Sequence, residues 1–333
     1  MNSELINVLL EIEPYHDVHG NCLEDIFATL ARWKKREYIM MYANAWDFGY
    51  FPPDDKKTLL GRRISTNRDG IKYIGKKYLL NKHVGIHMIE HDIQKPEQAL
   101  KRIKEANDKG LPVAIFINGF WCNWNTAFKK YDISHYCMVV EINRNEMICV
   151  DPFFNRKNVS LPLDNYMNGF GNVLVFEFLD QYHIGHWSEI VDHCVKNTLH
   201  GTDGKSDFQN IRLFAEEIMH TSSLKDEFDD CNQIEASSLL LCINSIGLAR
   251  KKNARVFFHF YRQYKIEALN IFGVQLDKAY AHWISIKNLL IKYIMTQYSK
   301  KYLSKIYEQI YEVAAYEENL AHEIVQYLKT NTP

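Results

Sequence analysis

The feature that most constrains the fold is a change of pattern near residue 180. Before it lie four short runs rich in β-branched and aromatic residues, which predict strands: residues 111–118, 134–142, 147–153 and 172–179. After it, apolar residues recur at helical spacing almost to the C-terminus. The sequence therefore predicts an α+β domain over residues 1–180 followed by an all-helical domain over residues 181–333.

Two helices are expected within the first half. Residues 22–35 carry apolar positions at helical spacing, including Leu23, Ile26 and Leu30. The second helix starts near Pro96, in the first-turn position that proline favours, and ends near Gly110. Both have one apolar face, and we expect that face of the Cys22 helix to pack on the sheet.

Composition narrows the class of protein. The chain has 333 residues, with 40 Lys and Arg against 41 Asp and Glu. This balance provides no electrostatic attraction to nucleic acid or to an anionic membrane, so neither is expected as a partner. No apolar stretch is long enough to cross a bilayer, and residues 1–16 lack the basic start of a secretory signal. Seven irregularly spaced cysteines favour reduced thiols and a cytoplasmic location.

Cys22 stands where the first predicted helix begins. Unpaired backbone N–H groups at a helix start favour the thiolate form of a cysteine and can also stabilise an oxyanion. Gly20, two residues earlier, permits a tight turn and close approach of a substrate. A cysteine at a helix start is more often structural than catalytic, so Cys22 needs a partner imidazole before it can be considered a nucleophile.

His135 and Asp151 supply candidate partners on one predicted hairpin. His135 lies near the start of the first strand, and Asp151 lies late in the second. With an odd number of loop residues, Asp151 would lie opposite Cys137, on the same face as His135 and within its reach. With an even loop and no bulge, Asp151 would point to the other face. The alternative interpretation is a core histidine and a turn-forming Asp-Pro pair.

Three blocks of sequence carry a resemblance to a known family. They are GNCLEDIFATLARW (20–33), GLPVAIFINGFWCNWN (110–125) and SHYCMVVEINRNEMICVDPF (134–153). Together they resemble the papain-like N-terminal domain of the butirosin biosynthesis protein H family, and LARKKNARVFFHFYRQY (248–264) is similar to its helical C-terminal part. The resemblance implies that Cys22 is the nucleophile, His135 the general base and Asp151 the residue that orients the imidazole.

The chain departs from the papain-like pattern before the cysteine. Papain-like enzymes place a glutamine there to complete the oxyanion hole, whereas this chain has YHDVHGNC. His16, His19 and Asn21 are the candidates to donate instead, beside the backbone N–H of Cys22. His16, His19 and Cys22 are also evenly spaced, but a zinc site would need a fourth ligand from elsewhere, so no metal is expected.

The aromatic loop 118–132 joins a predicted strand to the His135 strand. Loops in such positions commonly line a cleft, so a substrate wall is one interpretation of it. A loop packed over the core is an equally good interpretation. The candidate wall residues are Phe120, Trp121, Asn123 and Trp124.

The resemblance implies acyl transfer in antibiotic or peptide biosynthesis. Cys22 would take an acyl group from a thioester on an acyl carrier protein or peptidyl carrier domain and pass it to an amine-bearing small molecule or peptide. His135 would accept the proton of that amine. No cofactor is expected beyond the phosphopantetheine of the carrier, and a homodimer is compatible with the sequence. Two alternatives remain: a cysteine peptidase or an amide or thioester hydrolase with water as acceptor, and a catalytically silent binding protein of a biosynthetic assembly.

Overall fold

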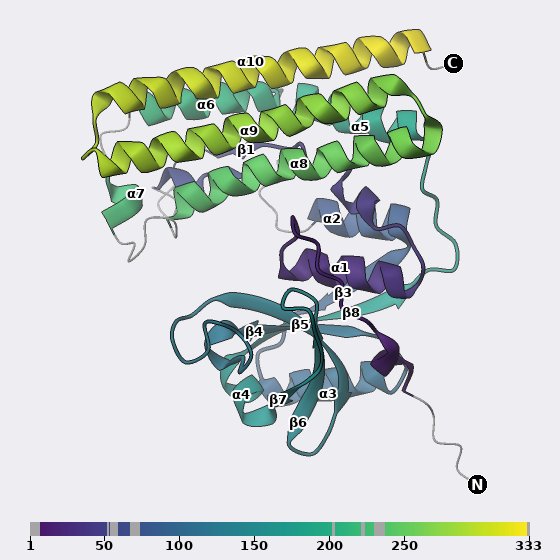
Figure 1. The fold of residues 1–333 in the computed structure, drawn as a ribbon. Helices are drawn as coiled ribbons and strands as arrows, with labels where there is room; N and C mark the ends of the chain where they lie inside the picture. The colour runs from purple at the N-terminus through teal and green to yellow at the C-terminus, as the bar shows by residue number, and fades with distance from the viewer. Residues whose placement is uncertain are drawn as a thin grey trace. The chain divides into compact units, whose positions relative to one another are not determined.

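The computed structural model describes residues 7–51, 53, 59–66, 74–201, 204–220, 224–229 and 237–331. The chain forms two compact units (Figure 1). Unit 1 comprises Met1–Met40 and Lys77–Ile184, and unit 2 comprises Met41–Lys76 and Gly185–Pro333. The predicted division into 1–180 and 181–333 therefore needs correction, because residues 41–76 belong with the C-terminal helices.

Unit 1 is built on a six-stranded antiparallel sheet. In spatial order its strands are β3 (Ile86–His91), β8 (Phe170–Phe178), β4 (Val113–Asn118), β5 (Ser134–Ile142), β6 (Glu146–Asp151) and β7 (Arg156–Pro162). The four predicted strands are confirmed as β4, β5, β6 and β8. The strands β3 and β7 at the two edges were not predicted.

The sheet is covered on both faces by the two predicted helices (Figure 1). Helix α3 (Pro96–Asn107) buries Ala99 and Ile103 against a core that includes Ile115 and Cys137. Helix α1 (Cys22–Trp33) lies on the other face, where the rings of Phe27 and Phe176 are 6.0 Å apart. Alternation along the strands sends side chains to both layers, so the buried strands are apolar on both faces.

The remaining short elements connect these layers. In unit 1 they are η1 (Val8–Glu11), η4 (Leu80–Val84), η5 (Gly119–Trp121) and α4 (Leu163–Gly169). Two of the three points where the chain passes from one unit to the other lie in η2 (Ile39–Tyr42) and α2 (Ile74–Leu79).

Unit 2 is mainly helical, as the periodicity predicts. Its helices are α5 (Trp187–His200), α6 (Asp207–His220), α7 (Asp226–Asp229), α8 (Ser238–Tyr264), α9 (Glu267–Met295) and α10 (Lys300–Asn331). The long helices α8, α9 and α10 run side by side (Figure 1). The unit also holds η3 (Leu60–Arg62) and a small hairpin of β1 (Gly49–Tyr50) and β2 (Ile64–Ser65), so it is not entirely helical.

A buried carboxylate explains why residues 41–76 belong to unit 2. Glu317 of α10 is fully buried and accepts hydrogen bonds from the indoles of Trp46, at 2.8 Å, and Trp283, at 2.7 Å. Arg250 of α8, also fully buried, binds the same carboxylate and donates to the carbonyl of Asp47 at 3.0 Å. Buried charges persist in proteins when they are paired in this way.

Candidate active site

Helix α1 begins at Cys22, and a capping box fixes that start. The Asn21 side-chain oxygen accepts from the N–H groups of Leu23 and Glu24, at 3.1 and 3.0 Å. The Glu24 carboxylate in turn accepts from the Asn21 N–H at 3.0 Å. The half-buried thiol of Cys22 thus sits in the first turn, where helical N–H groups point out of the helix.

His135 and Asp151 meet on the neighbouring strands β5 and β6. The imidazole Nε2 lies 2.6 Å from Asp151 Oδ2. The His135 side chain is 4% exposed and the Asp151 side chain is fully buried. The predicted pairing of these two residues is therefore present as a short hydrogen bond shielded from water.

A β-bulge produces this pairing, by a route the sequence did not predict. Asn143 N–H bonds to Glu146 C=O, so the hairpin loop has the two residues 144–145, an even number. The register then shifts between Val139 and Glu141, and Met138 pairs with Val150. Continuing this register by one residue places Asp151 opposite residue 137. The sequence left an odd and an even loop open. The loop is even, and one extra residue in β5 returns Asp151 to the face of His135.

Cys22 lies close enough to His135 to act on its protonation. Both a side-chain hydrogen bond and the charge of Cys22 contribute to the pKa of the imidazole, beside the larger effect of Asp151. Burial alone would lower the pKa of His135, but the hydrogen bonds and charges of Asp151 and Cys22 outweigh burial and raise this pKa to about 9. Because Nε2 is bound to Asp151, Nδ1 is the ring nitrogen left to face the sulfur.

Two further donors fix the Asp151 carboxylate. The indole Nε1 of Trp124 donates to Oδ2 at 2.6 Å, and the backbone N–H of Phe154 donates to Oδ1 at 3.3 Å. A carboxylate held by several donors orients its imidazole in one tautomer. Trp124 thus holds the carboxylate, a contact that the substrate-wall interpretation did not include.

The other residues of the aromatic loop face different neighbours. The rings of Phe120 and Trp121 are 5.3 Å apart, and Lys129 Nζ lies 3.3 Å from the Trp121 ring centroid. Asn123 is exposed and donates to the Ser160 carbonyl at 3.2 Å. These contacts anchor the loop to its own surroundings.

The loop before Cys22 contains a second imidazole–carboxylate pair. His16 Nδ1 lies 2.7 Å from Oδ2 of Asp25, a fully buried residue of α1. Burial raises the pKa of Asp25 to about 6, although His16 and the backbone N–H of Asp17 oppose the rise. Sequence reasoning named His16 but missed Asp25, whose position three residues after Cys22 was the available signal.

The other two oxyanion candidates have different contacts. Asn21 uses its side-chain oxygen to cap α1, as described above. His19 lies in the turn that follows Asp17, and its backbone N–H donates to Asp17 Oδ1 at 3.1 Å. A Cβ on Gly20 would meet Asp25 Oδ1 at 2.5 Å, so glycine is required here by close approach to that carboxylate.

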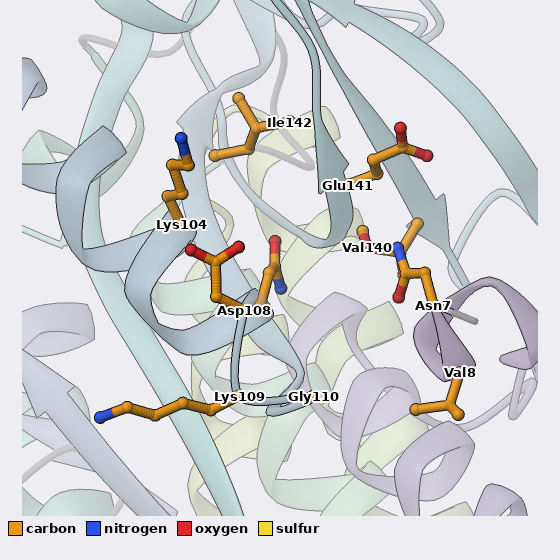
Figure 2. A pocket seen from close by; sticks show the side chains of 10 residues that line it. Asn7, Val8, Lys104, Asp108, Lys109, Gly110, Val140, Glu141 and Ile142 are labelled. Carbon is orange, nitrogen blue, oxygen red and sulfur yellow. Dashed lines mark hydrogen bonds between the residues drawn. The ribbon is translucent and has the colours of Figure 1, made fainter. Parts of the chain in front are cut away.

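Within the described residues, no group of three or more His, Cys, Asp or Glu side chains is arranged to hold a metal ion. None of the helices in the described part of the chain combines the length and the apolar character of a membrane-spanning helix. A pocket of about 620 Å³ lies beside the β5 bulge and is lined by residues from η1, the end of α3 and β5 (Figure 2). It includes none of the predicted site residues.

Comparison with known proteins leaves the resemblance as a prediction. No protein-family model matches the chain, and no curated protein matches it either.

Proposed function

We propose that unit 1 is a papain-like cysteine acyltransferase domain in which Cys22, His135 and Asp151 act together. The observation that carries the proposal is the position of His135, which is hydrogen-bonded to Asp151 at 2.6 Å and is close enough to Cys22 for that side chain to raise the pKa of the imidazole. A nucleophile, a base and an orienting carboxylate in this order are the requirements of covalent acyl transfer.

The first step follows from the high pKa of His135. A proton held on the imidazole at neutral pH favours a negatively charged sulfur beside it, which is the nucleophilic form of a cysteine. Cys22 Sγ forms a bond to the acyl carbon of a thioester, and the bond from that carbon to the donor sulfur breaks. His135 gives its proton to the departing sulfur. The first backbone N–H groups of α1 face the developing oxyanion.

In the second step the amine nitrogen bonds to the acyl carbon, the bond from that carbon to Cys22 Sγ breaks and the thiolate departs. The amine proton passes to an imidazole beside the site, which the family resemblance expects to be His135. The donor expected from the family resemblance is a carrier protein whose phosphopantetheine holds the thioester. The acceptor is an amine-bearing small molecule or peptide. Asp151 keeps the imidazole in one tautomer through both steps.

A small activated thioester tests the proposal without the carrier protein. Phenyl thioacetate should acetylate Cys22 in the intact chain, as seen by peptide mass spectrometry, and Cys22→Ala should abolish that adduct. His135→Ala should slow the acetylation by about 10²–10⁴-fold, the usual contribution of a positioned acid–base group. Acetylation of Cys22 no faster than that of the half-buried Cys242 would refute the proposal.

The same adduct separates transfer from the alternatives. An acetyl-Cys22 that persists in water and disappears when glycinamide is added supports an acyltransferase. Rapid release by water alone supports a hydrolase or peptidase. Absence of the adduct, with no preference of iodoacetamide for Cys22, supports the binding protein of a biosynthetic assembly.

A further inference from the structure

A second imidazole stands beside the first turn of α1. Asp25 lies three residues after Cys22, so the two side chains share one face of the helix. Side chains on a helix tilt toward its N-terminus, so the Asp25 carboxylate points toward the end that carries Cys22. Its hydrogen bond to His16 holds the imidazole at that end of the helix.

Phe153 connects this imidazole to the proposed site. Its ring centroid lies 5.5 Å from that of His16 and 6.2 Å from that of His135. Cys22 in turn is close enough to His135 to raise the pKa of that imidazole. Both imidazoles therefore pack against the same aromatic ring, and one of them adjoins the proposed nucleophile.

The two imidazoles differ in access to solvent. The His16 side chain is 36% exposed, whereas that of His135 is 4% exposed. An acceptor that arrives from solvent therefore reaches the His16 ring more easily. The ring atom that meets the carboxylate differs as well: it is Nδ1 in His16 and Nε2 in His135.

We propose that His16, positioned by Asp25, is a second general base that accepts the proton of the acceptor amine. With Nδ1–H donated to Asp25, Nε2 carries the lone pair that can take a proton. This inference rests on the proposed function, and it assigns to His16 a proton transfer that the family resemblance gives to His135.

In this second step the amine nitrogen bonds to the acyl carbon while the bond from that carbon to Cys22 Sγ breaks. The amine proton moves to His16 Nε2, and the sulfur leaves as a thiolate beside His135. His16 then releases its proton to water, and His135 regains one from water.

A pulse–chase experiment on the full chain separates the two steps. Phenyl thioacetate first loads Cys22, and glycinamide then discharges it at neutral pH. The variants are His16→Ala and His16→Gln, with His87→Ala as the matched control on β3, at the far edge of the sheet. Glutamine can donate a hydrogen bond but cannot accept the amine proton.

The expected result is normal loading of both His16 variants and discharge slowed by roughly 10²-fold, with His87→Ala unchanged in both steps. Discharge of His16→Ala at the wild-type rate would overturn the inference. Recovery of the wild-type rate in His16→Gln would also overturn it, because donation alone would then suffice. Equal slowing of loading would overturn the assignment to the second step. If wild type does not load at all, the proposed function itself fails, and the inference fails with it.

Discussion

At the scale of single residues, folding changes the pKa of His135. Its pKa is about 9 in the folded protein and near 6.5 in the unfolded chain, so folding favours the protonated ring. The stabilisation is fully present below pH 6.5 and is lost as the pH rises through about 9. The shift corresponds to roughly 3 kcal/mol.

The pH dependence of unfolding between pH 6.5 and 9 tests whether the protonated His135 ring stabilises the folded protein. The free energy of unfolding of wild type should fall between pH 6.5 and 9, and His135→Gln should remove most of this fall. An unchanged pH dependence in His135→Gln would contradict the charged contacts assigned to the ring. Chemical denaturation at several pH values provides the measurement.

Trp124 is expected to act on the site through Asp151. Trp124→Phe keeps an aromatic ring but removes the indole donor to Oδ2. We expect the free energy of unfolding to fall by about 1.5–3 kcal/mol, the usual value for a hydrogen bond to a charged group. Acetylation of Cys22 should slow as well. Trp121→Phe is the matched control, because Trp121 belongs to the same loop but packs beside Gly169.

At the scale of elements, the bulge in β5 decides which way Asp151 points. The extra residue leaves the Val140 carbonyl outside the regular ladder, and Asn7 Nδ2 donates to it at 2.9 Å (Figure 2). Asn107 Nδ2 donates to the neighbouring carbonyl of Val139 at 3.3 Å. Two asparagines thus satisfy backbone groups that a bulge would otherwise leave unpaired.

Asn7→Asp tests this support. The variant keeps the side-chain oxygen that caps η1 through Leu9 but loses the donor to Val140. Amide hydrogen exchange in β5 and β6 should become faster, and the free energy of unfolding should fall by about 1 kcal/mol. Asn81→Ala, which removes a side-chain contact to His87 on β3, should leave exchange in β5 and β6 unchanged.

The bulge also marks the limit of prediction from sequence. The strands and α1 follow from local pattern, and the Asn21–Glu24 capping box places Cys22 at a helix start. Periodicity alone cannot locate a β-bulge, so it left open which face of the sheet Asp151 would take. The buried Asp25 was missed because its partner His16 lies in an irregular loop that carries no periodic signal.

At the scale of the whole chain, unit 2 depends on contacts between distant segments. Asp47 is 203 positions from its partner Arg250 on α8, and Trp46 is 271 positions from its partner Glu317 on α10. No local pattern in the sequence predicts that pairing. The sequence therefore predicted a single domain boundary near residue 180, which placed residues 41–76 in the first domain rather than in unit 2.

Glu317→Gln tests the buried contacts that join Glu317 to Arg250, Trp46 and Trp283. It leaves the Arg250 charge buried without its counter-charge, and breaking such a pair costs about 3–5 kcal/mol. We expect the free energy of unfolding to fall by this amount. Adding Arg250→Met should recover part of the loss, because the uncompensated charge is then gone. A loss in the double variant as large as in the single one would show that the indole hydrogen bonds dominate instead.

The central claim is that His135 and Asp151 activate Cys22, and the rate of alkylation by iodoacetamide at neutral pH tests it most directly. Cys242 provides an internal control, since it is also half-buried but burial raises its pKa. Activation by His135 and Asp151 should make Cys22 react much faster than Cys242. His135→Ala and Asp151→Asn should each remove most of that advantage. Equal rates for the two cysteines in wild type, or an advantage of Cys22 that survives both substitutions, would contradict it.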